Sequence, residues 1–543
     1  MNLSFKFGVC LPSSCSSNEL ISVLRPDSGD PPVRNKVCAV VKTNDGLDPK
    51  DAGFYISVSI MGTIAAICCI SGAVDYLFGD YAKKTGYDKN PLWTVLMAFS
   101  LYSNVLSIFN TGGGPKEGQI GPLHCIRFFS MCWVVMGHYF SSLLLFVESP
   151  RDILEMGLDI TSEMIMNAYF SVDTFFFMSG ILLTFIWFKN YQRNAEATIG
   201  WKSWIMFYVH RILRLSPPYY MVVLFYAFVL KQLMIGFPIN ISAAFVSDQC
   251  ASTWWVELLY LHNWVMFDQQ CLGISWYLAS EMQMYLFTPL LIIPLAIKPI
   301  LGFIVAAIFF TISTAANIFL IYWYHWPANG AYLGPLDPEM SHMDLYGELM
   351  YDSPLIRCQV YLMGMIVGWF LQTKKKMRIN RIVNVVLWIL SGSLMLTVVL
   401  GLHDQSNGFA IPIFWRAMYS AFSRVAWGIG LAWIIISCFY GYGGPINDFM
   451  SWSIWAPLGR LTYCGYLTHI PIMMIVLAQS TDNFAFATFL EAFLGRYIGI
   501  VALVFFFSIF WSSLFEISFG KLEMILLGGF KSRPQVEKIS ERL

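Results

Sequence analysis

Arg127 and His138 lie in one apolar segment and carry side chains suited to chemistry. Eleven positions separate them, which in a helix is about 16 Å of rise and close to three full turns, so both side chains face the same side. A guanidinium can bind phosphate groups, and an imidazole can remove a proton from a hydroxyl. The simpler alternatives are that Arg127 anchors its helix at the membrane surface and that His138 is a packing residue.

Two carboxylates also lie in apolar segments, where a charge is costly and is therefore a functional candidate. Asp173 needs a partner, for which His138 or an arginine is available, unless it is a hydrogen-bonded packing residue. Glu281 follows Trp276 and Tyr277 near the outer start of its segment, where water could equally solvate it. The remaining ionisable residues of apolar segments are Arg357, Arg416, Arg424, Arg460 and His469.

A basic segment enters the membrane at His210, Arg211 and Arg214. The two arginines are three positions apart and share one helical face. They could bind an anionic group of a ligand, or they could anchor the chain to anionic lipid. Pro217 and Pro218 follow, so we expect an amphipathic lead-in at the interface and the crossing helix after the prolines.

The composition is that of a membrane protein. The 543 residues are 57% hydrophobic and 13% charged, about half the charged fraction of a typical soluble domain. Several apolar runs reach about 20 residues, the length that crosses a ~30 Å hydrocarbon core. A formal net charge of zero gives no overall field for an acidic partner or nucleic acid.

Eleven crossing helices are predicted, so the expected fold is an all-α, polytopic transmembrane bundle. Segment 92–110 is only moderately apolar, and we expect it to lie on the membrane or against the bundle, with a twelfth crossing as the alternative. The predicted spans are 54–78, 123–147, 164–188, 205–235, 276–297, 299–323, 355–372, 383–401, 415–440, 456–479 and 497–519.

The positions of lysine and arginine predict the orientation. If residues 1–53 are outside, the outer loops between spans contain only Arg151, with Arg496 at a span edge, and the inner loops and the tail contain many basic residues. Basic loops stay in the cytosol. The N-terminus is therefore predicted to be outside and the C-terminus cytosolic.

Cysteines in the predicted outer segments agree with this orientation. Cys250 and Cys271 share the outer loop 236–275, where a disulfide can persist, and the same loop contains a glycosylation sequon at Asn240. The N-terminal segment contains an odd number of cysteines, so a partner is missing or a thiol is free. These are Cys10, Cys15 and Cys38.

Several site classes find no support in the sequence. No Cys/His grouping has zinc-ligand spacing, no serine lies in a Gly-x-Ser-x-Gly elbow, and no basic face is interleaved with aromatic residues for nucleic acid. The glycine run 112–114 is followed by Pro115 rather than by the lysine of a phosphate loop. We interpret that run as a flexible cytosolic linker.

The order of these motifs resembles the acyltransferase 3 family, in its nose resistant to fluoxetine subgroup from animals. The resemblance covers nearly the whole chain and is firmest over about 120–520. Each motif is weak alone, and their number and order make the similarity strong. They are Cys10 to Ser16, Arg127 with His138, Ser171 to Gly180, His210 to Tyr219, Trp276 to Leu278, Arg357 and Leu461 to His469.

The resemblance implies transfer of an acyl group from acyl-CoA, a co-substrate, to a hydroxyl of a sugar, lipid or other small molecule. No bound cofactor is expected. His138 is the expected base, Arg127 its signature partner, and Asp173 the acid that orients His138. His210, Arg211 and Arg214 would bind the acyl donor. The possible acceptor or pocket residues are Glu281, Trp276, Tyr277, Arg357 and His469.

The resemblance also gives an expected domain division. Residues 1–53 would be the remnant of the subgroup's cysteine-rich extracytoplasmic domain, 54–119 the first transmembrane helix with a cytosolic linker, 120–520 the acyltransferase 3-like domain, and 521–543 a cytosolic tail. The plasma membrane and the endoplasmic reticulum both fit, and membrane lipids are expected partners.

Two other functions fit the same fold, since fold does not fix function. The chain could take up or transport lipids or drugs without catalysis, or it could be a receptor-like scaffold. The presence of Arg127, His138 and Asp173 favours retained chemistry, and the small ectodomain argues against a receptor.

Overall fold

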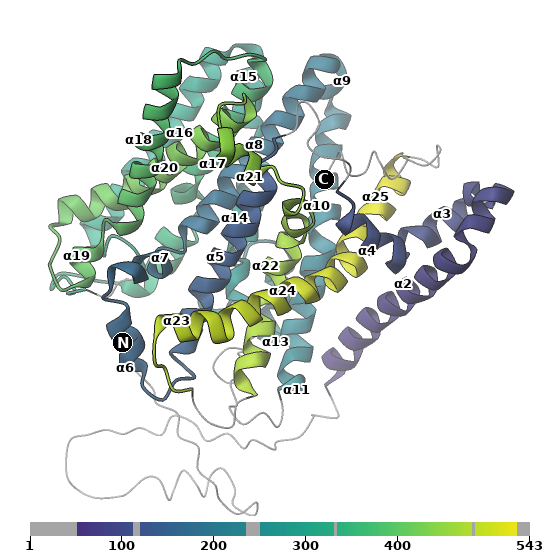
Figure 1. Ribbon diagram of the computed structural model, residues 1–543, viewed down its shortest axis with the longest axis horizontal. Coiled ribbons are helices and arrows are strands. Elements are labelled where there is room, and N and C mark those ends of the chain that lie inside the picture. The colour runs from purple at the N-terminus through teal and green to yellow at the C-terminus, as the bar shows by residue number, and fades with distance from the viewer. Residues whose placement is uncertain (1–50, 112–119, 235–249, 331–333, 480–483, 529–543) are drawn as a thin grey trace, which may run out of the picture.

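The computed structural model describes residues 51–111, 120–234, 250–330, 334–479 and 484–528 (Figure 1). Within these ranges the fold is all helical, and the one strand-like pairing is a bridge between Val147 and Phe484. The predicted all-α bundle is confirmed. Cys10, Cys15, Cys38, the sequon at Asn240 and the glycine run 112–114 lie outside the described residues.

Ten helical stretches of the described chain are long and apolar enough to cross a membrane, which makes the protein a multi-pass membrane protein. They are α2 (Ala52–Thr85), α8 (Phe170–Arg193), α10 with α11 (Trp201–Leu233), α14 with α15 (Trp276–Phe287 and Pro289–Ile297), α16 (Pro299–Tyr324), α17 (Pro354–Thr373), α18 (Arg381–Leu400), α20 (Ile413–Phe439), α22 (Trp455–Ala478), and the run from α23 (Phe489–Ala492) through α24 (Ile498–Trp511) to α25 (Ser518–Gly528).

The predicted second span is a helix, α5 (Leu123–Leu143), but it is not among these ten. Its 21 residues would reach about 31 Å, enough to cross. Arg127 and His138 lower its apolar character, and it packs against α8 and α22, so this polar helix is shielded from lipid. The bent pair α3 (Pro91–Ala98) and α4 (Leu101–Phe109), at 60°, gives the eleventh possible span by length and composition.

Segment 92–110 lies against other helices, as one of our two expectations stated. α4 packs on α2 and α22, and α3 contacts α25. Figure 1 shows α2 and α3 together at one end of the molecule, apart from the helices α16, α18 and α20 at the other end.

The centre of the bundle is built on the contact between α8 and α17. A Cβ at Gly364 would lie 2.1 Å from the carbonyl oxygen of Phe177, and one at Gly180 would lie 2.4 Å from that of Tyr361. Only glycine allows backbones this close, a packing mode common in membrane helices. The close approach fixes α8, and with it Asp173, against α17.

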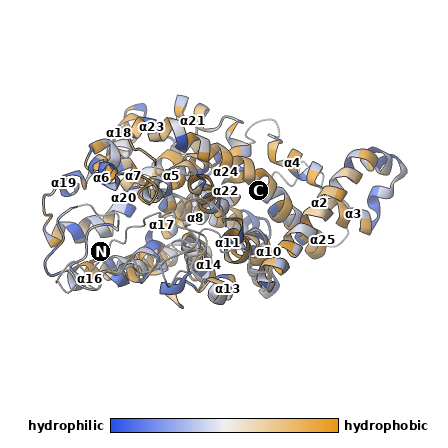
Figure 2. Ribbon diagram, turned by 90° about the horizontal axis from the view of Figure 1, so that it is seen from below, coloured by the Kyte–Doolittle hydropathy of each residue, from blue (hydrophilic) through white to orange (hydrophobic). Residues whose placement is uncertain are grey.

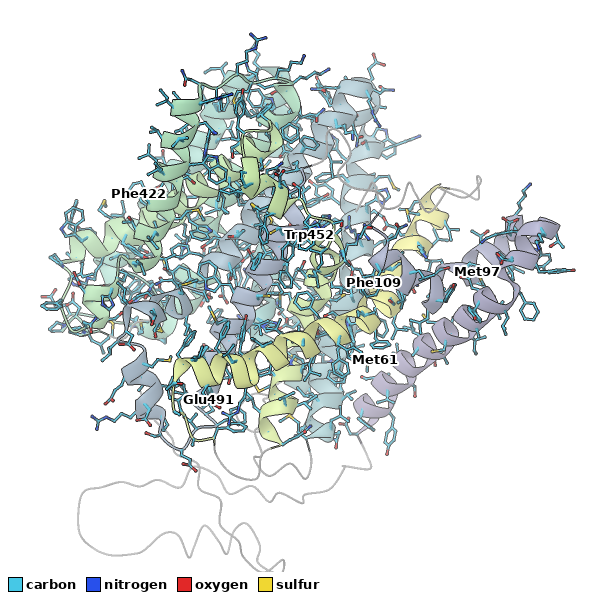
Figure 3. All side chains as sticks on the ribbon, viewed as in Figure 1. Met61, Met97, Phe109, Phe422, Trp452 and Glu491 are labelled. Carbon is cyan, nitrogen blue, oxygen red and sulfur yellow. A yellow bond between two sulfur atoms is a disulfide. The ribbon has the colours of Figure 1, made fainter. Side chains whose placement is uncertain are left out.

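Lipid-facing helices have the opposite character. In the apolar windows of α2, α16 and α18, only 11%, 22% and 22% of residues are buried. Figure 2 shows hydrophobic residues along the helices of the bundle. Exposed aromatic side chains such as Phe422 and Phe109 lie on the outer surface (Figure 3). A soluble protein would cover such an area.

The predicted break at Pro217 and Pro218 is wrong. α10 (Trp201–Leu224) runs through both prolines and continues as the π-helical turn η3 (Phe225–Leu230). Transmembrane helices tolerate proline because local π-helical adjustment and neighbouring helices satisfy the freed backbone groups. Arg211 and Arg214 therefore lie inside a continuous helix rather than on an interfacial lead-in.

Candidate active site

His138 and His469 form an imidazole pair inside the bundle. His138 is on α5 and His469 on α22, two helices that pack side by side, and their ring centroids are 5.2 Å apart. His469 is fully buried. The sequence predicted a base at His138 and a pocket residue at His469, and the structure brings these two residues into contact.

The ring of His469 is held by one hydrogen bond. Its Nδ1 lies 2.6 Å from the carbonyl oxygen of Tyr466. Because a carbonyl only accepts, Nδ1 carries the proton and Nε2 of the neutral ring has a lone pair. Nε2 has no hydrogen-bond partner among the described residues. The ring therefore offers one unused acceptor next to His138.

Aromatic rings surround the imidazole pair. Tyr466 lies beside His469, with ring centroids 5.6 Å apart, and Tyr277 lies 5.4 Å from Tyr466. Phe176 packs on Tyr277 at 4.7 Å. Buried aromatic side chains lower the local dielectric, which strengthens every polar interaction between them. Tyr277, a predicted pocket residue, thus lies in the wall beside the histidines.

Arg211 and Glu281 form an ion pair in which the carboxylate is buried and the guanidinium is half-buried. The Arg211 guanidinium donates to the Glu281 carboxylate, which also accepts from the Ser179 hydroxyl. The guanidinium lies over the ring of Tyr285, 4.8 Å from its centroid. Breaking such a pair leaves an uncompensated buried charge, typically at a cost of about 3–5 kcal/mol. Arg211 is therefore largely neutralised by Glu281.

Arg127 and Arg214 share the same region. Arg127 interacts electrostatically with Arg214, Arg211 and Glu516, and Arg214 interacts with Glu516. Glu516 itself accepts hydrogen bonds from Ser512 (2.7 Å) and from the Cys464 thiol (3.2 Å). Glu516 is thus shared by Arg127 and Arg214, and Arg214 also interacts with a second carboxylate, Glu523.

His210, the third predicted donor-binding residue, pairs with Glu523 of α25. The sequence analysis did not single out Glu516 or Glu523. The rule that flagged Asp173, a charge within an apolar run, also applies to Glu516 in the last predicted span, so that signal was present. Glu523 follows the predicted span and had no such signal.

Asp173 does not orient His138, so that expectation is wrong. Both of its carboxylate oxygens accept hydrogen bonds from Arg357 Nη1, at 2.9 and 3.1 Å, and Arg424 Nε lies 3.8 Å away. Arg357 is fully buried and lies over the Trp276 ring. A carboxylate held by two guanidiniums is stabilised where it is, so these residues form a second polar site.

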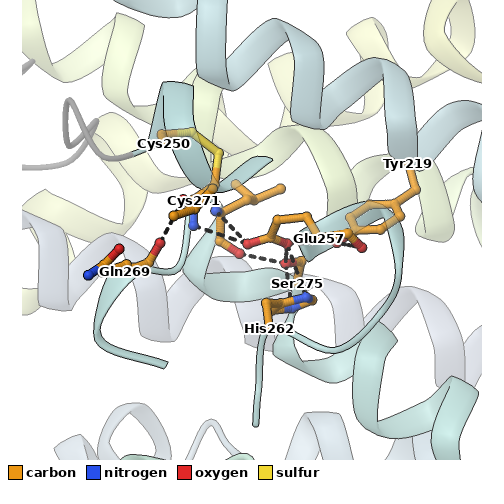
Figure 4. The surroundings of a disulfide bond; sticks show 9 residues. Tyr219, Cys250, Glu257, His262, Gln269, Cys271 and Ser275 are labelled. Carbon is orange, nitrogen blue, oxygen red and sulfur yellow. Dashed lines mark hydrogen bonds and ion pairs between the residues drawn. A yellow bond between two sulfur atoms is a disulfide. The ribbon is translucent and has the colours of Figure 1, made fainter. Parts of the chain in front are cut away.

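Cys250 and Cys271 are joined by a disulfide (Figure 4). Beneath it, the Glu257 carboxylate accepts from the backbone N–H groups of Cys271 and Leu272, both at 3.1 Å, and from the Tyr219 hydroxyl at 2.7 Å. Because both carboxylate oxygens accept hydrogen bonds there, Glu257 fixes the turn that precedes α14. Helix α14 carries Trp276, Tyr277 and Glu281.

His262 belongs to the same buried network. Its Nε2 lies 2.9 Å from the Ser275 hydroxyl, and its Nδ1 lies 3.4 Å from Glu257. Burial lowers the pKa of His262, and the Glu257 charge opposes that shift. The serine, histidine and glutamate resemble a hydrolytic triad in composition. All three are at most 1% exposed, and Ser275 also bonds Glu257 directly, so the group is structural.

Metal chemistry receives no support from the described part of the chain. It contains no group of three His, Cys, Asp or Glu side chains arranged to hold a metal ion.

The chain is similar to two proteins of Caenorhabditis elegans. It is 26% identical to "Nose resistant to fluoxetine protein 6", over 97% of this chain and 67% of the relative. It is 22% identical to "Regulator of hypoxia-inducible factor 1", over 66% of this chain and 72% of that protein. No solved structure matches.

The acyltransferase 3 family, described as "Acyltransferase domain", matches residues 121–520. That range contains the imidazole pair, the arginines around Glu516 and the Asp173 site. This match covers most of the chain, and it agrees with the likeness to the nose resistant to fluoxetine protein along nearly all of its length. The chain belongs to the acyltransferase 3 family.

Proposed function

We propose that the protein is a membrane-bound O-acyltransferase that moves an acyl group from acyl-CoA to a hydroxyl of a small molecule, sugar or lipid. The observation that carries this proposal is the contact between half-buried His138 and fully buried His469, whose ring centroids are 5.2 Å apart. A neutral imidazole is suited to act as a general base, and the family is one of acyltransferases.

In the proposed reaction, His138 takes the proton of the acceptor hydroxyl. The acceptor oxygen forms a bond to the thioester carbonyl carbon, and the carbon–sulfur bond breaks with its electron pair on sulfur. The proton on His138 then passes to the leaving thiolate, so the base is regenerated. General-base help of this kind contributes about 10²–10⁴-fold.

Arg127 and Arg214 are the best candidates to bind the phosphates of the donor. They interact with one shared carboxylate, Glu516, and phosphate attracts guanidinium through bidentate hydrogen bonds. Arg211 is less suited to this role, because Glu281 already occupies its guanidinium. In the predicted orientation these arginines lie on the cytosolic half of their helices, where acyl-CoA is available.

The test is acyl transfer by the purified full-length protein, with labelled acyl-CoA and a panel of hydroxyl acceptors. His138→Asn keeps much of the imidazole's shape and cannot accept the proton, so we expect the rate to fall by about 10²–10⁴-fold. His342→Asn is the matched control, because His342 is exposed and its positive φ of 48° suits asparagine.

Two results would count against the proposal. One is full transfer by His138→Asn. The other is accumulation of a lipid or a drug in vesicles by a wild-type protein that consumes no acyl-CoA, which would support the transport alternative. Fluorescence localisation would also decide between the plasma membrane and the endoplasmic reticulum, the two membranes we propose.

A further inference from the structure

Asp173, Arg357 and Arg424 form a buried polar site apart from the imidazole pair. They come from three helices, α8, α17 and α20, and are 0%, 0% and 5% exposed. Arg357 makes the short bonds to Asp173, and its Nε donates to the carbonyl of Tyr351 at 2.9 Å. Arg424 approaches the same carboxylate only to 3.8 Å.

The two guanidiniums retain hydrogen-bond donors for which the described residues provide no acceptor. Nη2 of Arg357, and Nε and Nη1 of Arg424, have no hydrogen-bond partner among the described residues. Guanidinium N–H groups always donate and cannot be neutralised by losing a proton. A buried donor without an acceptor costs about 1–3 kcal/mol, and more when the group is charged, so three in one place are expensive.

The net charge of the site also indicates that it could bind an anion. Two positive guanidiniums contact one negative carboxylate at this site. Asp352 is a further buried carboxylate within electrostatic reach of Arg357, but it accepts from Gln270, at 3.3 Å, and bonds neither guanidinium. A carboxylate or phosphate placed between Arg357 and Arg424 would supply both the negative charge and the missing acceptors.

We propose that Arg357 and Arg424 bind an anionic group, a carboxylate or a phosphate, carried by the acyl acceptor. Asp173 holds Arg357 in place, so Arg357 is oriented by one carboxylate and free to share Nη2 with a second. Arg424, with two unused donors, makes the larger contribution. Anion binding at this site is argued from the geometry alone. Only the assignment of the anion to the acyl acceptor rests on the proposed O-acyl transfer.

The site is connected to the imidazole pair by direct side-chain contacts. The Arg357 guanidinium lies 5.1 Å from the ring centroid of Trp276, and the next residue, Tyr277, belongs to the aromatic wall around His469. Trp427, one turn after Arg424, lies 5.4 Å from Trp133 of α5, the helix of His138. An acceptor held at Arg424 would thus lie beside the helices that carry the base.

Anion binding can be measured without an identified acceptor. Thermal unfolding of the purified full-length protein is followed at constant ionic strength in chloride, then with inorganic phosphate or succinate added. Binding to the native state stabilises it by RT ln(1 + c/Kd), where c is the free concentration of the anion, so Tm rises with that concentration and the rise depends on Kd. We expect phosphate or succinate to raise the Tm of the wild type, and the dissociation constant to increase about tenfold or more in Arg424→Gln, since a charged hydrogen bond is lost.

Arg416→Gln is the matched control. Arg416 is on the same helix, and both of its Nη groups already have acceptors: Nη2 pairs with Asp337, and Nη1 donates to the carbonyl of His325 at 3.1 Å. Only its Nε has no partner among the described residues. This variant should keep the anion-dependent rise in Tm whatever its own stability is. An equal rise in Arg424→Gln, or no rise with either anion in the wild type, would overturn the inference. Phosphate and succinate used separately distinguish the two kinds of anionic group.

The same measurement separates this inference from the proposed enzyme activity. His138→Asn should retain the rise in Tm, because the base is not part of the anion site. A wild-type protein that shows the rise and transfers no acyl group would keep the anion site and refute the transferase. Conversely, transfer of acyl groups to neutral and anionic acceptors at rates that Arg424→Gln leaves unchanged would refute the assignment to the acceptor.

Discussion

At the scale of single residues, the imidazole pair combines a fixed ring with an adjacent base. His469 is fixed through Nδ1, which lies 2.6 Å from the Tyr466 carbonyl, and its Nε2 lone pair is unused among the described residues. When His138 accepts a proton in the proposed reaction, it becomes a cation beside that lone pair. His469 is then the group placed to stabilise the imidazolium, whereas Asp173, which we expected to orient His138, is bound to Arg357 instead.

We therefore expect His469→Asn to lower kcat by about tenfold to a hundredfold, consistent with loss of one charge-assisted hydrogen bond. KM for acyl-CoA should change little, because His469 does not contact the arginines around Glu516. Transfer kinetics of the purified protein give both quantities. An effect on KM alone, or an equal effect of His342→Asn, would assign His469 to packing.

The sequence predicted the residue types well and their partners poorly. His138, His469, Arg211 and Glu281 were all singled out because charge or imidazole inside an apolar run is costly. The pairs that these residues form could not be predicted from the sequence. Arg211 and Glu281, for example, are 70 positions apart and meet only because their helices pack together. The two arginines that compete for Asp173 lie still further along the chain.

At the scale of helices, the pairing of α8 with α17 sets the position of the Asp173 site. A Cβ added at Gly364 would lie 2.1 Å from the carbonyl oxygen of Phe177. Because the obstacle is backbone, a methyl group there must push the two helices apart. Separation of α8 from α17 would lengthen the bonds between Asp173 and Arg357.

Gly364→Ala should therefore destabilise the protein, by about 1–3 kcal/mol as for other overpacked cores. Gly392→Ala is the control, because Gly392 lies mid-helix in α18 with open space around it; there, alanine should be neutral or stabilising by up to about 1 kcal/mol. The Tm values of the two purified variants test this. Equal Tm values would show that the α8–α17 contact adjusts without cost.

The helices themselves could largely be predicted, since apolar runs of about 20 residues identify them. The polar helix α5 was also predicted, although it falls outside the ten apolar spans. The path through Pro217 and Pro218 was not, because a proline's effect depends on whether neighbouring groups satisfy the freed carbonyls. The bent pair α3 and α4 was ambiguous for a similar reason: its packing on α2 is a tertiary property.

At the scale of the whole molecule, the polar sites divide between the two predicted sides of the membrane. Arg127 begins α5 on the predicted cytosolic side, and Arg357 begins α17 on the predicted outer side. His138 and His469 lie between the helix end that carries Arg127 and the helix end that carries Arg357. An enzyme of this shape could take its donor from one side and its acceptor from the other, which makes the orientation of the chain a mechanistic question.

The number of crossings determines whether the termini lie on the same side. If the ten apolar spans and α5 all cross, there are eleven crossings, an odd number that would put the ends on opposite sides. If α3 and α4 also cross, the number is twelve and both ends share one side. The charge pattern favours eleven, because the loops predicted to be outer then contain only Arg151, with Arg496 at a span edge.

We expect an epitope tag within residues 1–50 to be labelled on intact cells, or on sealed microsomes whose outer surface corresponds to the predicted outer side. A tag after Leu543 should be labelled only after permeabilisation. A cysteine placed at exposed Lys375, between α17 and α18, should behave as the C-terminal tag does. Labelling of both ends on the same side would show an even number of crossings, which is twelve if the bent pair crosses and ten if α5 does not. In that case the positive-inside pattern would identify which half of the chain keeps its predicted side. The accessibility of Lys375→Cys would then decide whether the proposed donor-binding residues Arg127 and Arg214 still face the cytosol.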